Sequence, residues 1–274
     1  MRIYISADIE GIAGVVTRDQ TLVEGFEYQA ARVWMTDSVT AAAQAAYDSG
    51  ASEVVIADSH GRGQNLLLER LPRDVQLVRA HPRPLSMMQG VEAGAYDGAL
   101  FIGYHTGSTN PEGVLAHTFR GATLREVRVN GTAVPEAGIN AAIAGHFDVP
   151  VLLVSGDDAT IAETQGFLPD IEGVTVKWAH SRQSARTLMP EASYELIADG
   201  VKRAIARRAS IKPYRIAGPI TLEVSFLFRQ PVEYLVMLKL VERVDSFTIR
   251  YVADDILDLQ RFLVFALGYS STLQ

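Results

Sequence analysis

The chain has 274 residues, of which 48% are hydrophobic and 21% charged, and its formal net charge at pH 7 is −7. This length suits one large domain or two moderate ones. The lack of a basic stripe argues against nucleic acid as a partner. The absence of cysteine leaves only His, Asp and Glu to hold a metal. A strand directly after Met1 argues against a signal peptide, and no uncharged apolar run approaches about 18 residues, so we expect no membrane span and a cytoplasmic protein.

Short apolar runs rich in β-branched residues predict strands in the first part of the chain. They cover residues 3–7, 54–57, 100–104 and 151–154. Near-continuous apolar strands of this kind are typical of a parallel sheet that is buried on both faces. Helical patterns alternate with these strands, so the sequence predicts an α/β fold with a largely parallel sheet flanked by helices.

Two helices and a hairpin are predicted between these strands. Residues 38–50 are rich in alanine and end at Gly50, a good helix C-cap. Residues 135–146 predict a second helix, with Pro135 in its first turn. The alternating stretch 124–134 contains Asn130–Gly131, which is a strong hairpin signal.

The pattern changes near residue 190. An amphipathic helix over 190–210 ends in basic residues, and a connection with proline and glycine follows it. The remaining stretches predict a strand, a helix, a strand and a helix over 220–228, 231–241, 246–253 and 254–268. We therefore expect a metal-binding catalytic α/β domain over 1–190 and a smaller β-α-β-α domain over 191–274.

Acidic and imidazole side chains follow the first three predicted strands. Asp8 and Glu10 follow the first, Asp58 and His60 the second, and His105 the third. The carboxyl ends of parallel strands share one edge of the sheet, where ligand sites form in α/β folds. Side chains two residues apart on an extended chain project to the same side, so Asp8 and Glu10 can serve one site. These ligand types bind zinc, manganese and related divalent ions.

Each of these residues also has a structural interpretation. An acid after a strand often caps the next helix, and a single histidine near a turn is usually a surface residue. Asp58 in particular is as well explained by orienting His60 or capping the following turn. The joint placement at three strand ends is what favours a metal site.

Further polar residues lie outside the strand ends. His117 lies in a glycine-bearing loop, and Glu136 begins a helix, where the helix dipole alone favours an acid. Asp157 and Asp158 follow the fourth predicted strand, and capping the helix that begins near Ala159 is their favoured interpretation. We interpret the remaining histidines as structural: His81, His146 and His180.

Six motifs in order resemble the zinc-dependent D-aminopeptidases of the DppA type. They are YISADIEGIAGV, DSHG, LFIGYHTG, GVLAHTF, NG with PEAGINAAIAG, and VPVLLVSGDD. The resemblance runs from Tyr4 to Asp158 and is looser beyond. It implies a dinuclear site with two zinc ions per chain, held by Asp8, Glu10, His60, His105 and Glu136. It further implies that Asp8 bridges the metals and that Glu136 is a ligand, a role that the residues alone do not suggest.

The resemblance implies an aminopeptidase that hydrolyses the N-terminal residue of short peptides containing D-amino acids. Two metals that share a carboxylate and a water would supply a bridging hydroxide near neutral pH. The family's catalytic histidine falls on His117, which would act as acid/base or as nucleophile, since imidazole titrates near neutrality. Such an enzyme must also bind a free ammonium group, for which Asp157 or Asp158 is the candidate acceptor beside the favoured capping role. The preference for D-residues rests on the resemblance alone.

Two other functions remain open from the sequence. A dinuclear metal phosphoesterase would use a similar cluster and add cations for phosphate, for which Arg62 and Arg120 are near enough in sequence. A non-catalytic metal-binding protein would have a closed site with no need for His117. The resemblance also implies a homo-oligomer, a ring-shaped decamer. The C-terminal helix supports this weakly, because residues 256–270 carry more apolar side chains than one buried face requires.

Overall fold

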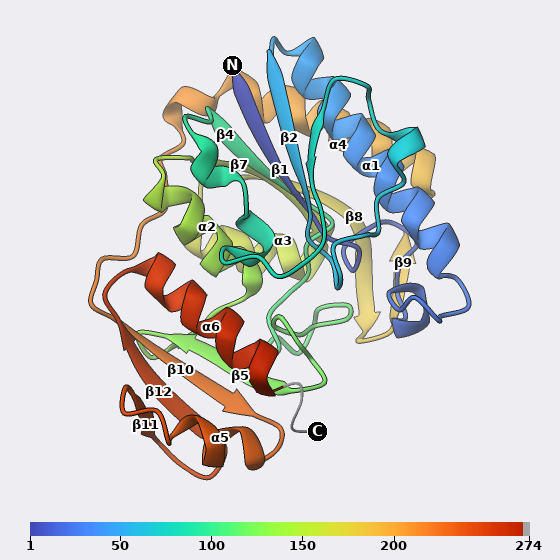
Figure 1. Cartoon of the computed structure of the whole chain (residues 1–274). Coiled ribbons are helices and arrows are strands. Elements are labelled where there is room, and N and C mark those ends of the chain that lie inside the picture. Colours follow the sequence, from blue (N-terminus) through green and yellow to red (C-terminus); the bar gives the residue numbers. More distant parts are fainter. Residues whose placement is uncertain (271–274) are drawn as a thin grey trace.

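A seven-stranded sheet with its flanking helices forms the larger part of the computed structural model, which describes residues 1–270 (Figure 1). Its strand order is β3-β2-β1-β4-β7-β8-β9, and only the β8–β9 pair is antiparallel. The strands are β1 (Arg2–Ala7), β2 (Glu53–Asp58), β3 (Gln76–Val78), β4 (Gly98–Ile102), β7 (Val151–Asp157), β8 (Glu172–Ser181) and β9 (Ser184–Thr187). The predicted largely parallel α/β sheet is therefore confirmed.

Helices cover both faces of this sheet because its strands are apolar on both sides. Ile3 and Ile5 of β1 face the helices α1 (Tyr28–Asp48) and α4 (Pro190–Ala206), which lie side by side. Tyr4 faces the opposite core, which contains α2 (Glu136–His146) and part of α3 (Asp158–Phe167). Single-turn helices lie in the connections: η1 (Arg18–Gln20), η2 (Leu68–Arg70), η3 (Ser86–Met88), η4 (Val91–Ala93) and η5 (Arg208–Ser210).

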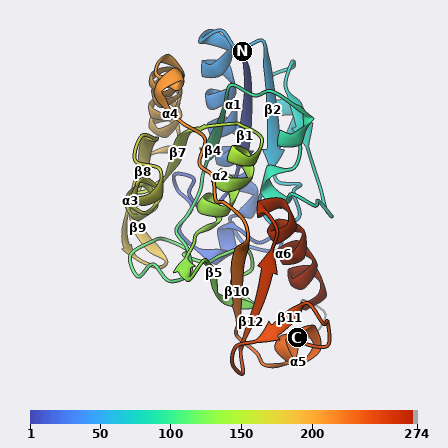
Figure 2. The ribbon, with the colours of Figure 1, turned by 90° about the vertical axis from the view of Figure 1, so that its left-hand side faces the viewer.

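A second, antiparallel sheet lies beyond the carboxyl ends of the large sheet (Figure 2). Its order is β11-β12-β10-β5-β6, with bounds β5 (Leu124–Val129), β6 (Thr132–Ala133), β10 (Ile220–Phe226), β11 (Val241–Arg243) and β12 (Thr248–Ala253). Helix α5 (Gln230–Leu235) joins β10 to β11, and α6 (Ile256–Ser270) packs on β10 and β12. We call this sheet with α5 and α6 the small lobe.

Helix α6 connects the two parts of the molecule. It contacts β12 and β10 on one side and α2 on another, so its buried residues Leu259 and Leu263 share one core with residues of both sheets. Packing within the chain therefore accounts for much of the apolar surplus of this helix that the sequence displays.

The sheets do not follow the order of the chain. Strands β5 and β6 precede residue 190 yet lie in the small sheet, whereas α4 follows it and packs on the large sheet. The predicted division into residues 1–190 and 191–274 remains a prediction. The hairpin at Asn130–Gly131 is confirmed, with both residues at positive φ, and it joins β5 to β6.

Several predicted boundaries are wrong. The helix expected over 231–241 ends at Leu235, because Val241 instead pairs with Tyr251 as an edge strand. Helix α1 begins at Tyr28, ten residues before the alanine-rich stretch that revealed it. Strand β4 ends at Ile102, because Gly103 adopts φ 75° and turns the chain. Among the helices of the described residues, none combines the length and the apolar character that crossing a bilayer requires.

Candidate metal centre

The candidate site lies where the order of the large sheet reverses. The chain proceeds from β1 outward to β2 and β3 on one side, and from β4 to β7 and β8 on the other. At such a switch point the loops after neighbouring strands separate and leave a crevice for ligands. Asp8 and Glu10 follow β1, His60 follows β2 and His105 follows β4, so the fold brings together the residues that the strand ends predict.

The first group of side chains consists of Asp8, Glu10 and His60. Nδ1 of His60 lies 3.2 Å from Oδ1 of Asp8 and 3.0 Å from Oε2 of Glu10. Nε2 of His60 lies 2.8 Å from the carbonyl oxygen of Thr21. A carbonyl only accepts, so Nε2 carries a proton and the lone pair of neutral Nδ1 points at two carboxylates. Such an arrangement of acceptors requires a shared cation or a further proton.

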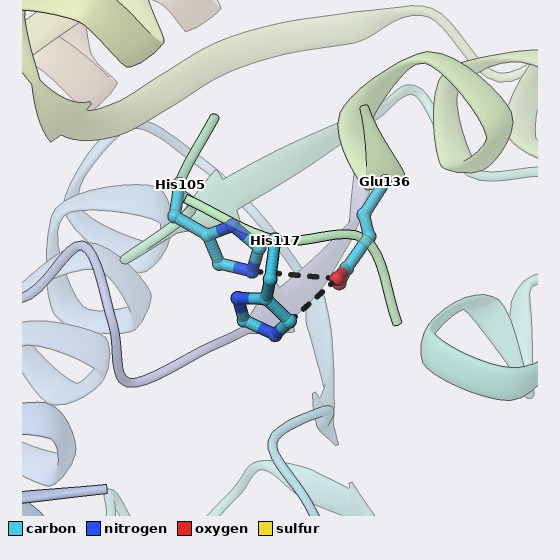
Figure 3. A group of neighbouring side chains, drawn as sticks. All are labelled: His105, His117 and Glu136. Atoms are coloured by element: carbon cyan, nitrogen blue, oxygen red, sulfur yellow. Dashed lines mark ion pairs between the residues drawn. The ribbon is translucent and has the colours of Figure 1, made fainter. Parts of the chain in front are cut away.

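The second group consists of His105, His117 and Glu136 (Figure 3). Oε1 of Glu136 lies 3.4 Å from Nε2 of His105 and 3.8 Å from Nε2 of His117. The two rings are stacked, with centroids 4.0 Å apart and an interplanar angle of 13°. Each Nδ1 donates to a backbone carbonyl at 2.9 Å, that of Thr106 or Leu115. Both Nε2 atoms are therefore free to bind a cation or to carry a proton.

Asp8 belongs to the first group and also faces the second. Its Oδ1 faces His60, as described, and its Oδ2 lies 3.4 Å from Nε2 of His105. Within each group one potential ligand atom per residue lies within 4.8 Å of the others. A carboxylate whose two oxygens face separate groups has the geometry of a bridging ligand.

The electrostatics of the cluster reflect an excess of negative charge. Burial alone would raise the pKa of Asp8, but the neighbouring imidazoles of His105 and His60 outweigh it and hold that pKa well below its usual range. Burial would likewise lower the pKa of His60 and of His105. Neighbouring carboxylates, chiefly Glu10 for His60 and Glu136 for His105, instead raise both pKa values well above the usual range. Without a metal, these imidazoles attract the protons that a cation would replace.

The donor set fits a divalent metal. Oε2 of Glu10 and Nε2 of His105 are buried and have no hydrogen-bond partner among the described residues. Leaving such atoms unsatisfied is costly. Carboxylate oxygens with imidazole nitrogens suit zinc and similar ions. The two groups are therefore candidate positions for two metals.

The site depends on a close crossing of the loops after β1 and β4. The amide of Gly11 donates to the carbonyl of Gly103 at 2.8 Å. A Cβ on Gly11 would lie 1.9 Å from the carbonyl oxygen of Tyr104, and one on Gly103 would lie 2.2 Å from that of Asp8. Neither position has room for a side chain, and the crossing sets the distance between Asp8 and His105.

The other predicted acids have structural contacts. Asp58 accepts from the amides of Asn65 at 2.6 Å and Leu66 at 2.8 Å and so fixes the turn that carries His60. Asp157 caps α3 through the amide of Thr160 at 2.7 Å, as the sequence favours. Asp158 accepts from the amide of Ala179 at 3.0 Å.

Lys177 is a residue that the sequence did not mark for the site. It lies on β8 with its side chain fully buried, and its Nζ donates to the backbone carbonyls of Glu10, Ile12 and Val15. Burial lowers the pKa of Lys177 to about 8, although Asp157 and Glu10 act in the opposite direction. The sequence feature that could have indicated this residue is a lysine within the apolar stretch VTVKWA, because a charge on a buried strand requires a partner.

Comparisons with known proteins agree on one family. Residues 1–265 match the sequence model of the D-aminopeptidase family. The chain is 31% identical over 261 residues to a D-aminopeptidase of Bacillus subtilis, covering 94% of this chain and 93% of the relative. It is also similar to the solved structure of a zinc-dependent D-aminopeptidase, DppA from Bacillus subtilis, described as a self-compartmentalizing protease. That match has a TM-score of 0.92 and 29% identity, and covers 98% of this chain and 97% of the other.

Gly11→Ala tests the importance of the loop crossing. The new Cβ would meet the backbone of Tyr104, which cannot rotate away, so the loops must separate. We expect a loss of about 2 kcal/mol or more in the free energy of unfolding, measured by urea denaturation, together with weaker metal binding. Gly166→Ala in α3 is the matched control, since nothing lies within 4 Å of its Cβ position. Equal stability of the two variants would show that the crossing tolerates a side chain.

Proposed function

The chain belongs to the D-aminopeptidase family of peptide hydrolases, and on this premise we propose that it is a zinc-dependent enzyme that removes the N-terminal residue from short peptides containing D-amino acids. The observation that carries this proposal is the convergence of six acid and imidazole side chains from segments far apart in the sequence, with Asp8 in contact with both His60 and His105. The comparisons do not favour a phosphoesterase, and Arg62 and Arg120, which would have served it, are exposed.

We assign two zinc ions per chain to the two groups. Glu10 and His60 would hold one ion, His105 and Glu136 the other, and Asp8 would bridge them. When bound, a zinc pair polarises a carbonyl and lowers the pKa of a coordinated water toward neutrality. Backbone contacts support the assignment, because Thr21 and Thr106 orient His60 and His105 so that one lone pair of each ring points into the site.

His117 is assigned as the acid/base. Its side chain is 20% exposed, whereas that of His105 is 2% exposed, so His117 is the member of its group that is open to a substrate. The carbonyl of Leu115 fixes the proton on Nδ1. Nε2 is then free to accept a proton and to pass it to the leaving amine, which peptide hydrolysis requires. A covalent acyl-histidine is the second candidate role.

The preference for D-residues rests on the family and on the described activity of the relatives. The cluster itself is compatible with either hand, because a metal pair and an imidazole act on the carbonyl and the leaving amine. Chirality would be set by contacts around the substrate side chain.

We also propose that the chain forms a ring-shaped homo-oligomer, a decamer. The relative DppA is described as self-compartmentalizing. Between residues 227 and 244 the small lobe exposes five large apolar side chains, those of Leu227, Phe228, Met237, Leu240 and Val244. Met237 is 73% and Leu240 58% exposed. A concentration of large apolar side chains within one short segment is typical of a contact with another subunit. The partner that we assign to these exposed side chains is a second copy of the chain.

The compartment that we propose is the cytoplasm. The chain contains no cysteine, which fits a reducing environment. Detection of the native protein in a cytosolic fraction, separated from membrane and secreted fractions, tests this assignment.

Metal content with stereospecific cleavage is the first test of the function. We expect about two zinc ions per chain and release of p-nitroaniline from D-Ala p-nitroanilide well above that from L-Ala p-nitroanilide. Chelation should abolish the release and added zinc should restore it, because the metals polarise the carbonyl. Bound metal with cleavage of neither substrate, but of a phosphate ester, would contradict an aminopeptidase.

His117→Ala separates the acid/base role from metal binding. We expect kcat to fall by about 10²-fold or more, with zinc content and melting temperature unchanged. His146→Ala is the control, since His146 is exposed at the end of α2 and should be dispensable for activity. Loss of one zinc ion along with activity would instead make His117 a ligand.

The oligomer interface can be tested with Met237→Glu combined with Leu240→Glu. Charges on a surface that is buried against another subunit are strongly unfavourable, so light scattering after gel filtration should show smaller species. Leu68→Glu is the control, because Leu68 is also exposed but lies on η2, which contacts α1. Dissociation by the control alone would place the interface elsewhere.

A further inference from the structure

Lys177 makes an unusual set of contacts for a buried charge. Its side chain is fully buried, and Nζ donates to three backbone carbonyls of one short segment, those of Glu10, Ile12 and Val15. The distances to Ile12 and Val15 are 3.2 and 2.5 Å. An ammonium has three donors, so its hydrogen-bonding capacity is used completely.

These contacts act on the segment that carries two of the candidate metal ligands. Residues 8–15 leave β1 and wind around the ammonium, with turn hydrogen bonds from Ile12 to Ile9 and from Val15 to Ile12. The carbonyl of Glu10 belongs to the same residue whose carboxylate faces His60. A contact at this carbonyl therefore sets the direction in which the Glu10 side chain leaves the backbone.

Asp157 occupies the neighbouring position on the adjacent strand. It pairs with Lys177 in the β7–β8 register and is also fully buried. Its Oδ2 accepts from the amide of Val114 at 2.8 Å, in the loop that carries His117 three residues later. The two strands thus present opposite charges side by side, each bound to the backbone of a different loop of the site.

We propose that Lys177 and Asp157 are a pair of positioning residues, in which Lys177 holds the Asp8–Glu10 segment and Asp157 holds the His117 loop in the geometry that binds metal. This inference rests on the proposed metal centre for its functional meaning. Its structural content, the order of two loops in the metal-free protein, is independent of that centre.

The sign of the effect on metal binding distinguishes positioning from simple electrostatics. Lys177 is a cation near the candidate ligands, so its charge opposes the binding of a second cation. If Lys177 acted through charge alone, its removal would tighten zinc binding. If it acts by holding Glu10, its removal weakens zinc binding, because a mobile ligand must be ordered at the moment of binding.

Amide hydrogen exchange of the metal-free protein is the first measurement. In Lys177→Met, exchange in a peptide covering residues 8–16 should rise about 10-fold or more, and exchange in residues 106–118 should remain near the wild-type rate. In Asp157→Asn, exchange should instead rise in residues 106–118 and remain near the wild-type rate in residues 8–16. Val201→Ala in α4, a core truncation that leaves Lys177 and Asp157 in place, controls for general loss of stability.

Zinc affinity is the second measurement, made by competition with a chromophoric chelator in a His105→Ala background. That background leaves Asp8, Glu10 and His60 as the complete group. Adding Lys177→Met should weaken zinc binding there about 10-fold or more, and Val201→Ala should not. Lys177→Gln removes the charge but supplies a polar amide donor. It is prepared in parallel in case the methionine variant does not fold, and it should also weaken zinc binding.

Two results would overturn the inference. Unchanged exchange in residues 8–16 of a folded Lys177 variant would show that the ammonium does not order the segment. Zinc binding that becomes tighter on removing the charge would assign Lys177 an electrostatic role. Absence of zinc binding in the wild-type protein would refute the proposed function instead, and the exchange measurement would still decide whether the two residues hold the loops.

Discussion

The mutual repulsion of three buried carboxylates is the constraint around which the site is organised. Asp8, Glu10 and Glu136 lie in one crevice with almost no access to water. Buried like charges are stable only when fixed dipoles and opposite charges compensate them. The amide of Ile9 donates to Asp8 at 2.9 Å and that of Phe119 to Glu136 at 2.6 Å. These donors leave a negative excess, which three imidazoles with free nitrogen atoms surround, and a pair of divalent cations would balance it.

The fold meets this constraint with backbone as much as with side chains. Each histidine of the cluster has one ring nitrogen held by a backbone carbonyl, so the protein has fixed which nitrogen points inward. The loops after β1 and β4 approach so closely that both Gly11 and Gly103 must lack a side chain. The site is therefore preorganised by contacts whose chemistry has nothing to do with metals, and substitutions at these positions affect it without removing a ligand.

The sequence revealed the parts of the site that depend on local pattern. Asp8, Glu10, His60 and His105 follow apolar strands directly, and parallel strands necessarily bring their carboxyl ends to one edge. Glu136 was indistinguishable from an ordinary first-turn acid, because its role depends on how α2 is docked, and only the family resemblance suggested it. Lys177 lies 167 residues from Glu10, a separation at which no spacing rule applies. The assignment of β5 to the small sheet was also out of reach, since its partner β10 follows about a hundred residues later and pairing at that distance leaves no local signal.

That distant pairing makes the small lobe part of the site although it supplies none of the cluster residues. The chain leaves the large sheet after β4, passes His105 and His117, forms β5 and β6, and returns to the large core with Glu136 at the start of α2. Hydrogen bonds to β10 and the residue after it fix this part of the chain. The amide of Leu227 donates to the carbonyl of Thr123, and the amide of Asn130 donates to the carbonyl of Thr221. The second group is consequently held by both lobes, whereas the first group is held by the large sheet and the loops around it. Because His105 lies next to both Glu136 and Asp8, any change in the small lobe that moves Glu136 also alters the environment of Asp8, so the position of β10 bears on the geometry of the centre.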